Sequence, residues 1–142
     1  MTGSSPPLDV AVGDLLPALR FGPVTREMLA RYAAASLDFN PIHIDSDFAR
    51  AAGRDDVIAH GMLSLGLAAR LVAEWAGAGR VRRIAGKFTA ITHVGDEIVV
   101  SGRVCAIDTG DTGRRVRVEL STETGGTKTV VAEALVSLPL SA

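Results

Sequence analysis

The segment GMLSLGLAARLVAEWAGAG, residues 61–79, decides the fold class. It is apolar around most of a helix circumference, with Arg70 and Glu74 as its charged residues, and such a helix requires burial on nearly every side. Those two charges leave it short of the roughly 20 clean apolar residues needed to cross a bilayer. We therefore predict a long buried helix from about Met62 to Ala76, and no membrane insertion.

Strand-like segments follow this helix without helical crossovers. They cover residues 82–92, 96–107, 114–122 and 127–138. In the third segment Val116, Val118 and Leu120 alternate with charged residues, which indicates a sheet with one solvated face. The glycines of DTGDTG and TGG suit tight antiparallel reversals. The sequence thus predicts an α+β fold in which an antiparallel sheet wraps around the long helix.

Shorter elements precede the helix. Residues 1–8 are small, polar and proline-rich, which predicts a disordered lead-in to a single domain over residues 9–142. We expect an edge strand over residues 15–21, where Pro17 limits pairing, and a helix capped by Thr25. That helix should end near Ser36.

Proline separates this first helix from the next. Pro41 interrupts LDFNPIHID, residues 37–45, so we expect a loop there. Ser46 is predicted to cap a short helix that Gly53 closes.

Charge and cysteine content exclude several function classes. The chain carries 15 Lys and Arg against 16 Asp and Glu, which argues against a general nucleic-acid binder. One cysteine, Cys105, excludes an intramolecular disulfide, a cysteine-based zinc site and an iron–sulfur cluster. Its place in a strand pattern predicts an inert core thiol. The N-terminus lacks the pattern of a signal peptide, so we expect a cytoplasmic protein.

The chain is apolar for a small domain. Hydrophobic residues make up 47% of it, and the mean hydropathy is +0.26. A domain of this size has limited interior in which to bury such surface. We expect a two-fold homodimer, with a heterodimer as the alternative.

Cofactor motifs are absent from the sequence. His43, His60 and His93 do not show metal-ligand spacing, and no G-x-G-x-x-G or Walker-type loop is present. We therefore predict chemistry that uses neither a metal nor a cofactor.

Two stretches carry residues suited to proton transfer and charge stabilisation. Asp38 and His43 lie five residues apart around Asn40-Pro41, and a carboxylate beside an imidazole can exchange protons near neutral pH. The alternative is a carboxylate that binds backbone amides beside an ordinary half-exposed histidine. At the start of the long helix, Gly61 would let a substrate oxygen approach unpaired backbone N–H groups. The alternative there is a simple turn glycine.

In order and spacing, three stretches resemble the MaoC-like hydratases, a family of (R)-specific enoyl-thioester hydratases and 3-hydroxyacyl-thioester dehydratases. They are ASLDFNPIHID (35–45), IAHGMLSLG (58–66) and GKFTAITHVGDEI (86–98). The resemblance spans about residues 25 to 105, and a D-x-N-P-x-H motif followed by H-G-M is quite specific. It implies a hot-dog fold, a sheet wrapped around a central helix and usually dimeric.

The resemblance also implies roles for particular residues. Asp38 and His43 match the catalytic pair, Gly61 matches the glycine whose N–H binds the thioester carbonyl, and Asn40 matches the asparagine that shapes the loop. His60 accompanies Gly61 as a substrate-site candidate, although we expect the Gly61 amide rather than the His60 ring to matter. The implied substrate is an acyl thioester of coenzyme A or acyl carrier protein. Some members of the family also have a supporting serine two turns into the central helix; this chain has Ala69 there and Ser64 closer to the helix start, so the resemblance assigns no third polar member.

Other polar residues are weaker candidates. A basic run could contact the phosphates of coenzyme A or an acidic carrier protein, or could be a solvated strand face; it comprises Arg80, Arg82, Arg83 and Lys87. Trp75 and Tyr32 are expected to serve packing, and His93 a turn.

The leading hypothesis is reversible hydration of a trans-2-enoyl thioester to the (R)-3-hydroxyacyl thioester. One rival is thioester hydrolysis on the same fold, although the Asp-Asn-Pro-His loop is not typical of that chemistry. The other rival is an acyl-binding subunit without activity of its own, which intact Asp38 and His43 disfavour.

Overall fold

The computed structural model describes residues 9–140, so the predicted disordered lead-in lies outside the described residues. The elements, in chain order, are β1 (Leu19–Phe21), α1 (Arg26–Ser36), the 3₁₀ turn η1 (Pro41–His43), α2 (Ser46–Ala51), α3 (Gly61–Ala76), the 3₁₀ turn η2 (Ala78–Arg80), β2 (Val81–Phe88), β3 (Ile98–Thr109), β4 (Arg114–Thr124) and β5 (Thr127–Leu138).

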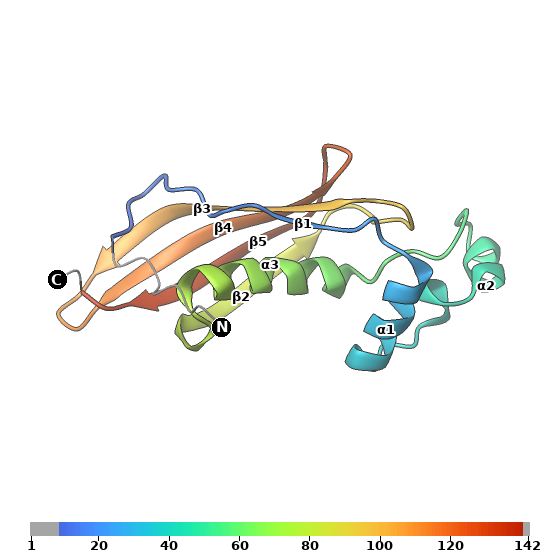
Figure 1. The fold of residues 1–142 in the computed structure, drawn as a ribbon, viewed down its shortest axis with the longest axis horizontal. Helices are drawn as coiled ribbons and strands as arrows, with labels where there is room; N and C mark the ends of the chain where they lie inside the picture. The colour runs from blue at the N-terminus through green and yellow to red at the C-terminus, as the bar shows by residue number, and fades with distance from the viewer. Residues whose placement is uncertain (1–8, 141–142) are drawn as a thin grey trace.

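The strands form one antiparallel sheet in the order β1-β3-β4-β5-β2, with β1 and β2 at its edges. Helix α3 packs along one face of this sheet and contacts four of its strands, β2 to β5. Figure 1 shows α3 lying beneath the long curved strands, while α1 and α2 extend beyond one end of the sheet. This arrangement confirms the α+β, hot-dog prediction.

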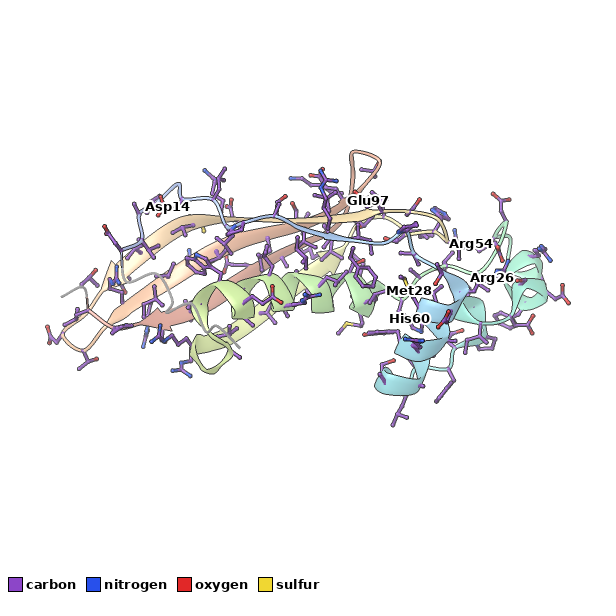
Figure 2. All side chains as sticks on the ribbon, in the orientation of Figure 1. Asp14, Arg26, Met28, Arg54, His60 and Glu97 are labelled. Atoms are coloured by element: carbon purple, nitrogen blue, oxygen red, sulfur yellow. The ribbon has the colours of Figure 1, made fainter. Side chains whose placement is uncertain are left out.

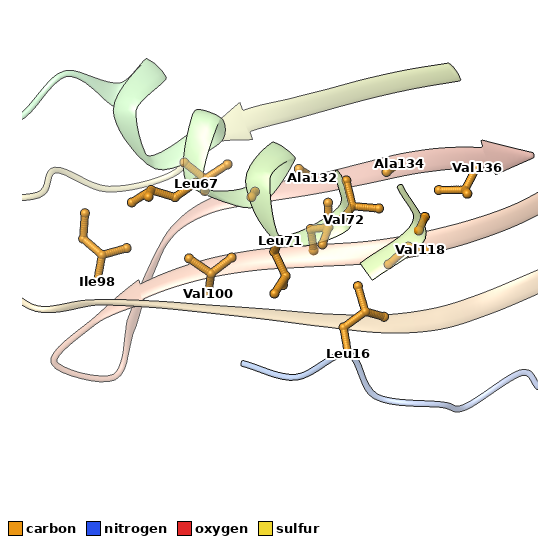
Figure 3. Close-up of a cluster of buried hydrophobic side chains, with 14 of the residues drawn as sticks. Leu16, Leu67, Leu71, Val72, Ile98, Val100, Val118, Ala132, Ala134 and Val136 are labelled. Carbon is orange, nitrogen blue, oxygen red and sulfur yellow. The ribbon is translucent and has the colours of Figure 1, made fainter. Parts of the chain in front are cut away.

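The core lies between α3 and the sheet (Figure 3). Val116, Val118 and Leu120 of β4 are buried, while the charged residues between them are exposed, as the alternation predicted. From the helix side, Leu71 and Val72 are packed into the same cluster. Burial of large apolar side chains contributes about 1.5–3 kcal/mol each, so this interface is the main source of stability.

Helix α3 is buried along one stripe rather than around its whole circumference. Its buried residues are Ser64, Leu67, Ala68, Leu71, Val72 and Ala76. On the opposite side Met62 is 52% exposed, and Gly66 is exposed as well. The prediction of burial on nearly every side is therefore wrong for a single chain, because the sheet covers one side of the helix.

Several predicted strand boundaries need correction. Of the predicted first strand, residues 15–21, only the part that forms β1 pairs with β3. Leu15 forms an isolated bridge to Arg103 outside β1. Strand β2 ends at Phe88, which pairs with Val130, rather than at Thr92. The regular pairing stops there because the next two amides, of Thr89 and Ala90, both donate to the Thr129 carbonyl. The other strands differ from prediction by two residues or fewer at each end.

The first two helices begin where capping chemistry places them. Thr25 caps α1, as predicted, by accepting from the Met28 amide at 3.1 Å. For α2 the predicted cap was wrong by one residue, because Asp45 accepts from the amides of Asp47 and Phe48. Ser46, the predicted cap residue, instead uses its hydroxyl in a side-chain network.

That network ties the two helices to the segment leading into α3. Arg26 donates to Ser46 Oγ at 2.5 Å and forms an ion pair with Asp56, while Ser46 donates to Asp56 at 3.0 Å. Asp56 also accepts from the Val57 amide at 2.7 Å, and these contacts lower the pKa of its carboxyl, the Val57 hydrogen bond most. Figure 2 shows Arg26 and Arg54 in this part of the molecule, on the same side as His60.

Among residues 9–140, we find no helix long and apolar enough to cross a membrane.

Candidate active site

The loop after α1 brings an acidic and a basic side chain together through local hydrogen bonds. Leu37 ends α1 in the left-handed region, at a φ of 60°, which turns the chain away from the helix axis. Asp38 Oδ1 accepts from the Asn40 amide at 3.2 Å, and Asn40 Oδ1 accepts from the Ile42 amide at 3.1 Å. Pro41 begins η1, so the predicted loop contains a helical turn that ends at His43.

A hydrogen bond to the main chain sets the tautomer of His43. Its Nδ1 lies 2.7 Å from the main-chain oxygen of Ile58, and a carbonyl oxygen can only accept a hydrogen bond. The neutral ring therefore carries its proton on Nδ1 and keeps a lone pair on Nε2. The Asp38 carboxylate and ligand atoms of both His43 and His60 all lie within 4.8 Å of one another. One water molecule can bridge groups at that separation.

His60 is the buried member of this cluster, with 1% of its surface exposed. Its Nε2 lies 3.2 Å from the main-chain oxygen of Asp38, and its ring stacks on that of His43 with centroids 3.9 Å apart and planes inclined by 27°. Burial is the main cause that lowers the pKa of His60, so its ring is favoured in the neutral form. Its Nδ1 is buried and has no hydrogen-bond partner among the described residues.

Gly61 opens α3 at the wall of a cavity of about 280 Å³. His60 is the N-cap residue but makes no side-chain cap hydrogen bond, so the first N–H groups of the helix stay available to a ligand. A Cβ at Gly61 would lie 2.9 Å from Cδ1 of Phe88, which shows how closely that ring covers the glycine. Asp38 and His43 line the cavity together with Ile58, Ala59, Gly61, Met62, Ser64, Phe88, Ala90, Ile91, Thr92, Thr129 and Val130.

Sequence reasoning missed three contributors to the site. Tyr32, predicted to serve packing, does so against the site itself, since its ring lies 4.7 Å from that of His60. Burial, and secondarily the charge of Asp38, raises the pKa of Tyr32. Phe88 and the Ile58 carbonyl carry no motif signal, because their roles depend on contacts distant in sequence.

The structure does not bring the basic run beside Asp38 and His43. Arg80 and the first residues of β2 lie at the far end of α3 from Gly61, about 22 Å away at 1.5 Å per helical residue. Arg82 donates to Ser137 and to the Gly79 carbonyl. Lys87 lines a different hollow of about 600 Å³ on the polar face of the sheet.

Three further side chains can be compared with prediction. Cys105 is half-buried beside a β-bulge rather than in the core, and burial raises the pKa of its thiol. Trp75 packs against the core, and His93 is an exposed turn residue, both as predicted.

Of the described residues, Asp38, His43 and His60 are the cluster that could hold a metal ion. A bound ion lies about 2.0–2.1 Å from each histidine nitrogen, in line with its in-plane lone pair. Nδ1 of His43 and Nε2 of His60 already face the main-chain oxygens of Ile58 and Asp38, which leaves one nitrogen on each ring for an ion. Chemistry without a metal stays a prediction.

Comparison with known proteins identifies the family. The model of the MaoC like domain matches residues 18–126. The 3-hydroxyacyl-[acyl-carrier-protein] dehydratase, mitochondrial, of Arabidopsis thaliana is 35% identical over 113 residues, which span 79% of this chain and 65% of the plant protein. The (R)-specific enoyl-CoA hydratase of Aeromonas caviae is 33% identical over 114 residues, which span 78% and 84% of the two chains.

Solved structures agree with this relationship. The (R)-hydratase from A. caviae involved in PHA biosynthesis superposes with a TM-score of 0.79 at 29% identity, covering 92% of this chain and 98% of the hydratase. A chain of the ChsH1-ChsH2 complex from Mycobacterium tuberculosis superposes with a TM-score of 0.81 at 26% identity, covering 92% and 99%. The chain therefore belongs to the family of MaoC-like dehydratase domains.

Proposed function

We propose that this protein catalyses the reversible hydration of trans-2-enoyl thioesters, carried on coenzyme A or acyl carrier protein, to (R)-3-hydroxyacyl thioesters. The observation that carries the proposal is the meeting of Asp38, His43 and the N-terminus of α3 around one cavity. The named activities of the A. caviae and A. thaliana relatives support the same reaction class.

Charge stabilisation begins at the thioester carbonyl. Its oxygen accepts a hydrogen bond from the Gly61 amide at the positive end of α3, where negative charge is favoured. As the electron pair of the C2–C3 double bond moves toward the carbonyl, the oxygen gains enolate character. The loss of one such donor typically costs about 10²–10³-fold in kcat.

Proton transfer falls to the two side chains on the loop. His43 accepts a proton from the bound water at Nε2, the nitrogen left free by the Ile58 hydrogen bond. Asp38 orients the same water molecule, and the oxygen of that water forms a bond to C3. The enolate then collapses as the pair returns a proton to C2, so that the net change is the addition of one water molecule.

A direct assay separates this reaction from its rivals. A short trans-2-enoyl-CoA is incubated with the purified protein, and the conjugated thioester absorbance is followed beside the release of free thiol. Loss of absorbance without thiol supports hydration, whereas stoichiometric thiol release supports hydrolysis and overturns the proposal. If neither signal changes, the chain alone is an acyl-binding or partner-dependent subunit, and the proposal fails for this chain.

We further propose that the working unit is a pair of chains, either two copies or this chain with a related one. Strand β2 is a sheet edge, and the side of α3 that carries Met62 and Gly66 is exposed. A second chain placed there would cover both features. A solved relative is itself described as a complex of two different chains.

A further inference from the structure

His60 contacts both members of the catalytic pair through different groups. Its Nε2 donates to the main-chain oxygen of Asp38 at 3.2 Å, since the carbonyl cannot donate. Its ring face lies against the ring of His43, with centroids 3.9 Å apart. One side chain thus fixes the backbone that carries the carboxylate and the plane of the imidazole.

The position of His60 is itself tightly determined. Its exposed fraction is 1%, and Tyr32 of α1 packs against its ring at 4.7 Å. Its backbone is the N-cap of α3, the helix packed along the sheet. The next residue along the chain is Gly61, which presents the amide proposed to bind the thioester oxygen. His60 therefore contacts the proposed proton-transfer groups and directly precedes Gly61, the proposed oxyanion donor, in the chain.

His60 is unsuited to chemistry of its own. Its one N–H in the neutral form is used by Asp38, and its Nδ1 is buried without a partner among the described residues. A second proton would leave a buried N–H unsatisfied, which is costly. With 1% exposure the ring also offers almost no surface to a substrate.

We infer that His60 is a positioning residue, whose neutral ring sets Asp38 and His43 at the separation and orientation that hydration requires. This inference rests on the proposed function and revises the expectation from sequence that the His60 ring is dispensable. Misplacement of a catalytic group by about 1 Å can cost about 10²-fold in rate. The role therefore predicts a large effect on turnover from a residue that does not touch substrate.

Three substitutions separate the two contacts. His60→Gln retains an N–H donor for Asp38 but loses the stacked ring, His60→Phe retains a ring but loses the donor, and His60→Ala loses both. We expect kcat to fall about tenfold in each conservative variant and about a hundredfold in the alanine variant, with KM changed less than about threefold. His93→Ala, at an exposed histidine, is the matched control and should retain wild-type kcat.

The result that overturns the inference is a folded set of His60 variants with kcat within about twofold of wild type, or with a raised KM and unchanged kcat. If His60→Ala fails to fold, the Gln and Phe variants decide the matter alone.

A second readout does not depend on activity. Two-bond ¹H–¹⁵N correlation spectra report which nitrogen of each imidazole carries a proton. In the His60 variants the ring of His43 loses its stacking partner and should leave the Ile58 carbonyl part of the time, so we expect its Nδ1-protonated pattern to mix with the Nε2-protonated one. The pattern should persist in His93→Ala. An unchanged His43 pattern contradicts the inference. If the wild-type protein hydrates no enoyl thioester, the proposed function fails, and these spectra still decide whether His60 orients His43.

Discussion

Replacing Gly61 tests the crowding at the start of α3. A Cβ added at Gly61 would lie 2.9 Å and 3.0 Å from two atoms of the Phe88 ring, whereas carbon atoms at optimal contact lie about 3.5–4.0 Å apart. The ring would have to retreat by about 0.6 Å or more. Phe88 is 55% exposed and has room to move, so Gly61→Ala should fold.

The loss should therefore appear in activity rather than in folding. Because Phe88 lines the cavity, its retreat alters the wall beside the thioester carbonyl, and we expect kcat/KM to fall about tenfold. In Gly61→Val the added methyl groups also obstruct the amide, and the loss should approach the roughly 10²–10³-fold cost of a missing oxyanion donor.

A double-mutant cycle tests the contact itself. Rates of enoyl-CoA hydration are measured for Gly61→Ala, Phe88→Ala and the double variant, with thermal unfolding in parallel. If the methyl–ring clash is the cause, Gly61→Ala should cost less in the Phe88→Ala background than in wild type. Gly79→Ala is the control, because a Cβ there meets no atom within 4 Å. Additive effects at Gly61 and Phe88, or an equal loss in Gly79→Ala, would refute the reasoning.

Three other outcomes are expected. Asp38→Asn and His43→Ala should each lower the rate of enoyl-CoA hydration about 10²–10⁴-fold, and the double variant should be little worse than the worse single variant. Additive losses in the measured rates would show that the two groups do not act on one step. Asp56, whose pKa is lowered in the folded state, contributes stability that is present above its unfolded pKa and is lost as pH falls through the folded value. Unfolding curves should therefore show that Asp56→Asn is less stable than wild type at pH 7 and that the difference disappears in acid; a constant difference would contradict this. Light scattering at micromolar concentration should give twice the 14.8 kDa chain mass for the protein alone, or the sum of the two chain masses for an equimolar mixture with a related subunit. A stable monomer under both conditions would contradict a paired unit.

Local rules predicted most of the fold. Strict alternation along β4 placed Val116 and Val118 inside, and Thr25 capped α1 as expected, because both features depend on neighbours within a few residues. The extent of β2 depended instead on how far its residues pair with β5, which no pattern within residues 82–92 encodes. The exposed side of α3 has a similar origin, since helix composition indicates that burial is needed but not which surface provides it.

In the candidate site, too, short motifs were predictable and contacts between distant residues were not. Asp38, His43 and Gly61 were selected by motif and spacing, and the structure places all three at one cavity. The contacts of His60 could not be predicted in this way, because they join it to the Asp38 backbone, 22 residues away in sequence, and to the ring of His43. Charge alone grouped Arg80 with Lys87, although Arg80 precedes β2 and Lys87 lies near the other end of that strand.

Chiral analysis of the product is the most direct test of the central claim. A trans-2-enoyl-CoA is converted by the wild-type protein in water, and the 3-hydroxyacyl group is released and resolved into its enantiomers. The proposed delivery of water and proton from the Asp38–His43 pair, with the carbonyl held at Gly61, predicts the (R)-alcohol. Formation of the (S)-alcohol or of a racemate would contradict the account.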